Sequence, residues 1–347
     1  MFLEQLGADA RLAELLQPHA ADGCELGRIS FAAHEQYRVY LESGDCEAAP
    51  AGRLRWSDTL PAVGDWVATR RVDRELALIE AVLPRRTCFS RHAAGSATEE
   101  QVIAANIDVA VVVCGLDGNF NLRRLERYLV LAHESGAEPV IALNKVDLCG
   151  AVSERLEAVR EVSPGERIVA ISATESVAPL ASLVRGRTVV FLGSSGVGKS
   201  TIVNALLGGA SQPTTPVREC DSKGRHTTTS RMLIPIPGGG AVIDTPGMRE
   251  LQLWASEESL EDVFAEVAAF AAGCRFGDCT HGAEPECAVR AALETGALTV
   301  SRWESYRKLQ AEVRHQHVQS DARAQAEQKR RWKAIHKAFR HHPKYQR

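Results

Sequence analysis

The pattern of apolar and polar positions divides the chain into segments of different periodicity. Leucines recur at helical spacing over residues 1–22, and Pro18 is expected to end that helix. Residues 23–88 carry short alternating runs separated by Gly, Pro and Asp, which predict a small antiparallel β-domain. The clearest runs are 38–41, 65–68 and 76–79. A five-stranded barrel fits a segment of this length.

Between residues 89 and 253, buried strands alternate with helices. Amphipathic stretches such as 122–133 separate runs that are apolar throughout. These runs lie at 109–113, 140–143 and 188–192. Apolar strands between helices are typical of a parallel sheet covered on both faces, so we expect an α/β domain. Residues 254–347 are mostly helical in pattern, with a group of Cys and His residues that interrupts them.

Composition narrows the class of protein. A chain of 347 residues with 24% charged residues is too long for one ordinary domain and too apolar to be disordered. The amino terminus lacks the apolar core of a signal peptide, and the strongest apolar run, 109–114, is too short to span a bilayer. We therefore expect a cytoplasmic protein with no membrane partner. A monomer is expected too, because there is no heptad pattern or interface stripe.

The segment 193–200 has the spacing G-x-x-x-x-G-K-[ST] of a phosphate-binding loop (P-loop). Its glycines let backbone N–H groups face phosphates, while Lys199 reaches the β- and γ-phosphates and Ser200 offers a hydroxyl to Mg²⁺. The strand before it and the helix after it disfavour the alternative, an ordinary Gly-rich turn. The expected nucleotide contacts are Gly193, Ser194, Ser195, Gly196, Val197, Gly198, Lys199, Ser200 and Thr201.

A second phosphate motif, Asp244-Thr-Pro-Gly247, follows an apolar run. The Asp244 carboxylate would hold Mg²⁺ through a water, and the Gly247 N–H would meet the γ-phosphate. Taken alone, D-x-x-G is a common surface turn. Downstream of a P-loop the functional interpretation is favoured.

The tetrapeptide Asn144-Lys145-Val146-Asp147 follows a strand, at the edge of the sheet where α/β folds bind ligands. Asp147 would accept hydrogen bonds from guanine N1–H and the 2-amino group, which adenine lacks. Asn144 would brace the loop, and the Lys145 stem would lie over the base. Such a tetrapeptide also occurs by chance in turns, but with a P-loop it predicts GTP binding. After the next strand, a backbone N–H toward the guanine oxygen would come from Ser172 and Ala173.

The order of these motifs is unusual. The base-reading motif at 144–147 precedes the P-loop at 193–200, whereas most GTPases have the P-loop first. A circularly permuted domain explains the inversion, because the positions of strands around a nucleotide matter and their chain order does not. The γ-phosphate sensor at 244–247 then adjoins the Cys/His region, which nucleotide state could move.

Four residues with the spacing Cys274-x4-Cys279-x-His281-x5-Cys287 offer three thiolates and an imidazole. This set suits tetrahedral Zn²⁺ with no open position, so the expected site is structural. Buried cysteines beside an incidental histidine are the alternative. The other six cysteines show no comparable clustering, which disfavours it.

The inverted motif order, the preceding β-domain and the Cys/His cluster together resemble the ribosome small-subunit-dependent GTPase A family. The resemblance covers nearly the whole chain, includes residues 224–229, and is weak before residue 85. It implies an OB-fold barrel, a circularly permuted G domain and a zinc domain. It also implies binding to the small ribosomal subunit late in maturation, with release on GTP hydrolysis that the subunit stimulates.

Met248 stands where Ras-like GTPases place the glutamine that orients the attacking water, so intrinsic turnover should be slow. His226, in a loop that resembles the first switch, is the candidate for positioning that water; contact with RNA is the alternative. One threonine of the same loop should complete the Mg²⁺ shell. The sequence does not distinguish Thr227, Thr228 and Thr229, and Thr228 is taken as the candidate.

The tail at 323–347 interleaves aromatic and basic residues, which makes phosphate neutralisation and base stacking on RNA available. The predicted barrel and the family resemblance favour rRNA as the partner. A solvated amphipathic helix is the alternative. Two other function classes stay open. One is a GTP-gated RNA-binding protein with incidental hydrolysis, and the other is a P-loop ATPase with a fortuitous base motif.

Overall fold

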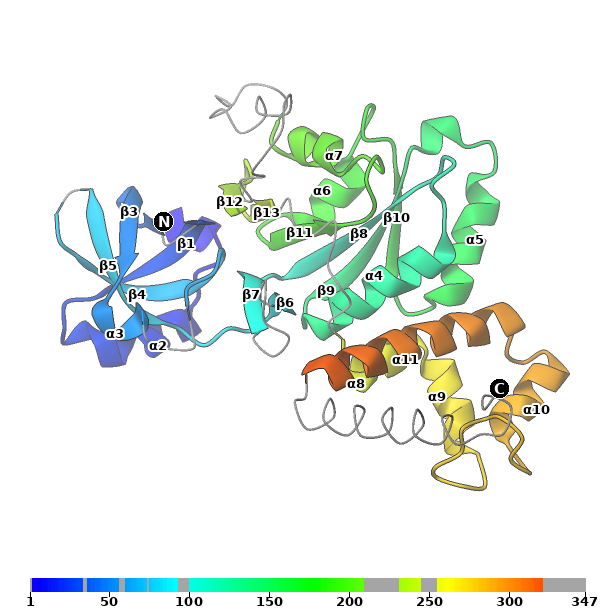
Figure 1. Cartoon of the computed structure of the whole chain (residues 1–347). Coiled ribbons are helices and arrows are strands. Elements are labelled where there is room, and N and C mark those ends of the chain that lie inside the picture. Colours follow the sequence, from blue (N-terminus) through cyan, green and yellow to red (C-terminus); the bar gives the residue numbers. More distant parts are fainter. Residues whose placement is uncertain are drawn as a thin grey trace, which may run out of the picture. The chain divides into compact units, whose positions relative to one another are not determined.

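The computed structural model describes residues 2–33, 36–55, 60–73, 75–92, 100–208, 231–244 and 255–320. The chain forms two compact units, which are described separately (Figure 1). The first comprises Met1–Phe89 and Val102–Leu251, and the second comprises Ser90–Gln101 and Gln252–Arg347.

The amino-terminal part of the first unit is a closed five-stranded barrel (blue and cyan in Figure 1). Strand β1 pairs with both β2 and β4, while β3 pairs with β5, so the order β1-β2-β3-β5-β4 returns to β1. Apolar side chains such as Ile29, Val39 and Ile79 fill its interior. The OB-fold barrel is thereby confirmed. Its elements are β1 (Glu25–Ala33), β2 (Gln36–Leu41), β3 (Gly44–Pro50), α3 (Gly52–Arg55), β4 (Trp66–Arg71) and β5 (Leu76–Val82).

The single amino-terminal helix expected over residues 1–22 is instead two helices, α1 (Phe2–Gln5) and α2 (Ala10–Ala20). The chain turns between them at Gly7, whose φ of 94° favours glycine. Asp9 then caps α2 by accepting a 3.0 Å hydrogen bond from the Leu12 N–H. Pro18 lies inside α2 and does not end it. The φ of proline is itself helical, so the last turn continues at the cost of one hydrogen bond.

The rest of the first unit is built on a parallel sheet of order β10-β9-β8-β11-β13, with β12 antiparallel at the β13 edge. This confirms the α/β fold. The strands are β8 (Val109–Gly115), β9 (Glu138–Asn144), β10 (Arg167–Ile171), β11 (Thr188–Leu192), β12 (Arg231–Pro235) and β13 (Ala241–Asp244). The helices are α4 (Leu122–Glu134), the short η1 (Val146–Leu148), α5 (Val152–Val162), α6 (Ala178–Val184) and α7 (Lys199–Leu206).

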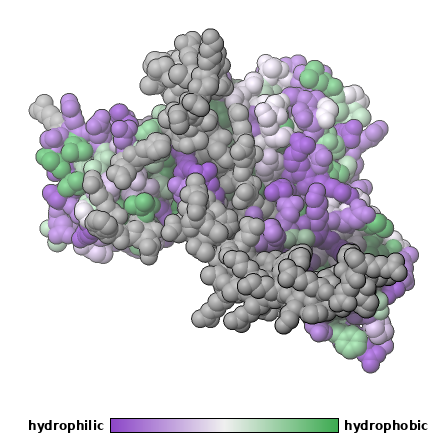
Figure 2. Space-filling model, in the orientation of Figure 1, coloured by the Kyte–Doolittle hydropathy of each residue, from purple (hydrophilic) through white to green (hydrophobic). Residues whose placement is uncertain are grey.

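Helices cover both faces of this sheet. On one face, alternate residues of β8, such as Val111, pack in one core with Leu180 of α6 and Ile202 of α7. Helix α4 contacts β8 and β9 and lies in front of the sheet in Figure 1, and its outward surface is hydrophilic in Figure 2. Because the strands are parallel, their carboxyl ends share one edge, where the loops that carry the predicted site meet.

Strand β12 also joins the sheet to the barrel, because β1 pairs with it through Phe31 opposite Met232. Beside this junction lies Arg28, which is only 1% exposed. Its guanidinium donates to the Asn106 carbonyl at 3.1 Å and to the Thr188 hydroxyl at 2.8 Å. One buried cation therefore ties the barrel to the sheet.

The second unit is mostly helical, as expected. Its helices are α8 (Glu257–Val263), α9 (Ala265–Ala272), α10 (Ala288–Thr295) and α11 (Val300–Ser320). The buried Arg302 of α11 donates to Glu266 at 2.5 Å, and its guanidinium lies 4.0 Å from the ring centroid of Phe264. Strands β6 (Cys88–His92) and β7 (Glu100–Ala105) form a separate two-stranded sheet, and each has residues in both units. Among the described helices, none has the length and apolarity needed to cross a membrane.

Candidate functional site

Asn144 brings together three segments that the sequence analysis assigned to one site. Its side chain ends β9 and is 1% exposed. The side-chain Nδ2 donates to the Val197 carbonyl of the P-loop at 2.8 Å, and Oδ1 accepts from the Ala173 N–H at 2.9 Å. The base motif, the P-loop and the loop after β10 are therefore joined by one buried amide.

The conformation of the P-loop depends on its glycines. Gly193, Gly196 and Gly198 have φ values of 143°, 79° and 100°, which side chains disfavour. At Gly198 a Cβ would lie 2.2 Å from the Asn144 Nδ2, so contact between the two loops needs glycine there. Helix α7 begins at the next residue, with its N–H groups facing the loop.

Polar side chains of the P-loop lie at the mouth of the site. Ser195, Ser200 and Thr201 are exposed, whereas Val197 is buried and anchors the loop. The Lys199 ammonium donates to the carbonyls of Gly193 at 2.5 Å and Ser194 at 2.7 Å. The cation is thus folded over the loop in which phosphates would bind.

Lys145 has a left-handed backbone, with φ of 68°, and its ammonium reaches back to the P-loop. It donates to the Gly196 carbonyl at 2.7 Å and to the Asp117 carboxylate at 2.5 Å. The hydrogen bond from Lys145, aided by the Asn119 N–H, holds the pKa of Asp117 below its usual value. Asp117 is not among the residues predicted from the sequence, although it follows a buried strand that ends at the ligand-binding edge.

Asp147 and Val146 lie in η1, just beyond Lys145. The Asp147 side chain is exposed, and no described residue makes a hydrogen bond to its carboxylate, which leaves it available to a base. The buried Ser172 pairs its hydroxyl with Thr174 at 3.1 Å. Of Ser172 and Ala173, which were expected to offer a backbone N–H to the guanine oxygen, Ala173 donates its N–H to Asn144 Oδ1.

Asp244 is exposed at the end of β13. Because β13 is parallel to β11, the carboxylate lies at the same edge of the sheet as the P-loop. Four other residues of the expected phosphate site fall outside the described part of the chain. They are Gly247, Met248, His226 and Thr228.

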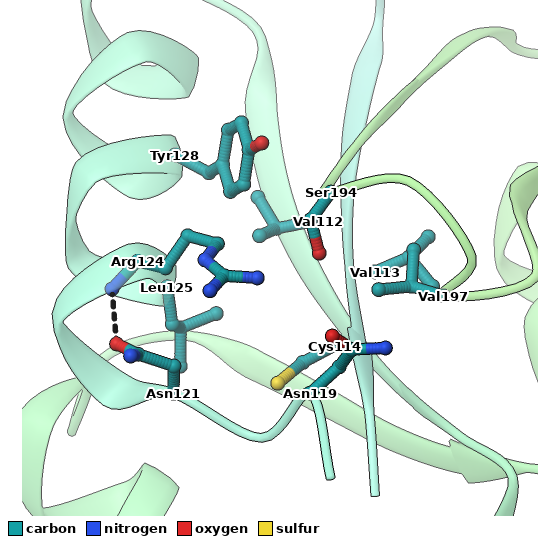
Figure 3. A pocket seen from close by; sticks show the side chains of 10 residues that line it. All are labelled: Val112, Val113, Cys114, Asn119, Asn121, Arg124, Leu125, Tyr128, Ser194 and Val197. Carbon is teal, nitrogen blue, oxygen red and sulfur yellow. Dashed lines mark hydrogen bonds between the residues drawn. The ribbon is translucent and has the colours of Figure 1, made fainter. Parts of the chain in front are cut away.

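A shallow pocket of about 230 Å³, part of it open to solvent, lies between α4 and the P-loop (Figure 3). The Arg124 side chain extends into it toward Ser194. Burial raises the pKa of the Cys114 thiol and of Tyr128, so both are uncharged at neutral pH. The lining residues are Val112, Val113, Cys114, Asn119, Asn121, Arg124, Leu125, Tyr128, Ser194 and Val197. Polar side chains of α4, Arg124 and Tyr128, therefore line the same pocket as the P-loop residues Ser194 and Val197.

In the second unit, the four predicted metal ligands gather in one cluster, with all ligand atoms within 4.8 Å of one another. The His281 Nδ1 is 3.5 Å from the sulfurs of both Cys274 and Cys287, which are 3.9 Å apart. Ligands bonded to a tetrahedral ion at about 2.0–2.3 Å lie roughly 3.3–3.8 Å from one another. The separations among Cys274, His281 and Cys287 are close to these values, and together with Cys279 the four residues could hold a metal ion.

Burial and the neighbouring thiols of Cys287 and Cys274 raise the pKa of the Cys279 thiol to about 11. Burial opposes ionisation of Cys274, yet the N–H groups of Val289 and Ala288 hold its pKa below the usual value. Glu284 shapes the loop that carries His281, because its carboxylate accepts hydrogen bonds from the Thr280 hydroxyl and from the N–H groups of Thr280 and Gly282. These bonds, above all the Thr280 hydroxyl, lower the pKa of Glu284 to about 2.

Comparison with known proteins agrees with this geometry. The family model described as RsgA GTPase matches residues 82–254. The small ribosomal subunit biogenesis GTPase RsgA of Opitutus terrae is 46% identical and covers 98% of this chain and 97% of its own. The protein of that name from Syntrophotalea carbinolica is 42% identical, with 96% of both chains covered.

Two solved structures are similar along most of the chain. YjeQ from Thermotoga maritima has a TM-score of 0.64 and 28% identity, and covers 84% of this chain and 98% of its own. The circularly permuted GTPase YloQ has a TM-score of 0.63 and 27% identity, with 84% and 96% covered. The chain therefore belongs to the RsgA GTPase family, whose members are GTP-hydrolysing enzymes with a circularly permuted G domain.

Proposed function

We propose that this protein binds the small ribosomal subunit, acts late in its maturation and hydrolyses GTP to GDP and phosphate. The subunit stimulates hydrolysis, and hydrolysis releases the protein. The observation that carries the proposal is the Asn144 amide, which connects the base motif to the P-loop and to the loop after β10. The names of the relatives, which describe small-subunit biogenesis, support the identity of the partner.

Within this function, the base site consists of Asn144, Lys145, Val146 and Asp147, with Ser172 and Ala173 behind them. The exposed Asp147 carboxylate accepts from the guanine N1–H and 2-amino groups. Ser172 and Ala173 close the pocket with a backbone N–H toward the guanine oxygen, and Ala173 also holds Asn144 in place. Residues 193–201 bind the phosphates through backbone N–H groups and the Lys199 ammonium.

Metal ions serve two purposes in the proposal. The Cys274, Cys279, His281 and Cys287 cluster holds one structural Zn²⁺, since three thiolates and an imidazole leave no open position. Mg²⁺ accompanies GTP, with ligands from Ser200 and Thr228 and a water-mediated contact to Asp244. When bound, it neutralises charge on the β- and γ-phosphate oxygens.

Hydrolysis is assigned to Lys199, His226, Asp244 and Gly247. Lys199 and the Gly247 N–H stabilise the charge on the γ-phosphate, and His226 positions the attacking water. The supporting observation is Met248, because a thioether cannot orient a water as the glutamine of Ras-like GTPases does. Because Met248 stands in place of that glutamine, GTP turnover should be slow without the partner.

The proposed domains are a helical segment at 1–22, the barrel at 23–88, the G domain at 89–253 and the zinc domain at 254–347. The basic tail at 323–347 contributes rRNA contacts through phosphate neutralisation and stacking. The partner is thus held by the terminal domains, while the G domain times its release.

The direct test is GTP turnover with and without purified small ribosomal subunits. Small subunits should raise the turnover rate at least about tenfold, because a site without the glutamine of Ras-like GTPases turns over slowly until the partner binds. Large subunits are the control and should not stimulate. GTP binding with no stimulation would support a GTP-gated RNA-binding protein instead, and a preference for ATP would support an ATPase.

The same assay tests His226. A His226→Ala variant should bind GTP normally and lose most of the stimulated turnover, because only the water is displaced. Normal stimulated turnover in this variant would assign the positioning of the water to another group.

A further inference from the structure

We infer that Asp117 is a positioning residue of the nucleotide site, which holds the Lys145 ammonium against the P-loop and so couples the base-reading loop to the phosphate-binding loop. The inference rests on the proposed GTP function. It adds a fourth segment, the loop after β8, to a site assembled from the base motif, the P-loop and the loop after β10.

The geometry places the Lys145 ammonium between two acceptors from different loops. It lies 2.5 Å from Asp117 Oδ2 and 2.7 Å from the Gly196 carbonyl. Both charged side chains are about one quarter exposed, at 24% for Lys145 and 26% for Asp117. A partly desolvated, charge-assisted hydrogen bond is stronger than an exposed surface ion pair, so this contact is able to orient the lysine.

The loop after β8 is shaped to present this carboxylate. The Asn119 N–H donates to Asp117 Oδ1 at 3.0 Å, which leaves Oδ2 for the lysine. Gly115 permits the fold, because a Cβ at that position would lie 2.8 Å from Asp117 Oδ1. Gly115, at the end of β8, and Asn119, in the loop, therefore set the orientation of the carboxylate.

Lys145 needs an anchor of this kind because its backbone is strained. A lysine with φ of 68° is in the left-handed region, which costs roughly 1 kcal/mol in a non-glycine residue. Asp147, two residues further on, is exposed, and its position depends on the same short loop. Holding the Lys145 ammonium keeps the loop closed on the P-loop and the Asp147 carboxylate at the base position.

In this inference Asp117 does not contact the base. Its loss should therefore weaken the binding of guanine nucleotides without changing the preference for guanine over other bases. The test is dissociation of a fluorescent GDP analogue and of a matching GTP analogue from the full-length protein. Asp117→Asn keeps the shape and removes the charge, and should speed dissociation of both by about fivefold to thirtyfold.

A double-mutant cycle separates positioning from a general loss of structure. Lys145→Met alone should speed dissociation, and adding Asp117→Asn to it should have little further effect, because the two residues act as one pair. Additive effects would overturn the inference. The matched control is Asp45→Asn, which breaks a 2.6 Å ion pair with Arg38 in the barrel and should leave dissociation unchanged.

Base preference distinguishes failure of the inference from failure of the proposed function. Asp147→Asn should shift binding from guanine to xanthine nucleotides, whereas Asp117→Asn should retain the guanine preference. If the unaltered protein fails to bind guanine nucleotides, the proposed function is wrong. If it binds them and Asp117→Asn dissociates at the same rate, only the role of Asp117 is wrong.

Discussion

The buried amide of Asn144 keeps its position because residue 198 has no side chain. A Cβ at Gly198 would meet the Asn144 Nδ2 at 2.2 Å, and Asn144 cannot retreat, since its Oδ1 is held by the Ala173 N–H. The glycine of the phosphate motif thus has two roles here. It lets the P-loop turn, and it admits the residue that connects the P-loop to the base site.

A Gly198→Ala variant should therefore lose guanine nucleotide binding by at least about tenfold and be destabilised by about 2–3 kcal/mol, because strain and a steric clash add. Gly186→Ala is the matched control: its φ of 70° is also left-handed, but no atom lies within 4 Å of the added Cβ. It should cost only about 1 kcal/mol. Urea unfolding and GDP binding measure both, and equal losses would contradict the clash.

Strand β1 has a part in both halves of the first unit. It closes the barrel against β2 and β4, and it extends the parallel sheet through β12. Arg28, at the centre of this strand, also contacts Trp66, with its guanidinium 4.8 Å from the ring centroid. Burial lowers the pKa of Arg28 to about 10, opposed by the Asp108 and Asp65 carboxylates, so the guanidinium is charged at neutral pH. It donates to carbonyl and hydroxyl oxygens on several segments.

Removing that cation should leave buried acceptors without donors. Arg28→Met is expected to lower the free energy of unfolding of the first unit by about 3 kcal/mol or more. Arg53→Met, which removes the exposed arginine from its pair with Glu80, should cost less than about 1 kcal/mol. Denaturant unfolding of both variants is the measurement. Equal destabilisation would mean that β-pairing alone holds the barrel to the sheet.

The nucleotide site and the metal cluster lie in different units of the protein. The residues described at the nucleotide edge all belong to the first unit, and the four metal ligands all belong to the second. Metal binding and nucleotide binding should therefore be separable, even though the γ-phosphate sensor directly precedes the second unit in the chain.

Metal removal tests this separation. Chelation, or the variant Cys274→Ser, should release one metal ion per chain and reduce helical content, because small metal-binding units depend on the ion for stability. The rate of GDP dissociation should stay within about twofold of the rate for the untreated protein. Cys24→Ser, whose thiol is outside the cluster, is the control and should keep its metal. Elemental analysis, circular dichroism and GDP dissociation give the readouts; loss of GDP binding would contradict independent units.

Features formed by residues that are close together in the sequence could be predicted from it. The P-loop, the base motif and the Cys/His cluster each lie within one short segment of the chain, so the spacing of their residues predicts their chemistry. Apolar periodicity likewise predicted the barrel strands and the parallel sheet, because burial of one or both faces sets that period. The two amino-terminal helices were missed, since the leucine pattern continues across the turn at Gly7.

Contacts between distant segments were decided only by tertiary structure. Lys145 meets Asp117 across 28 residues of chain, Asn144 meets Val197 across 53, and Arg28 meets Thr188 across 160. An aspartate after a strand or an arginine within one has no local signature, because its role depends on which loops the sheet order brings together. The sequence by itself determined which chemistry is present, and the packing of parallel strands at one edge decided which residues hold it in place.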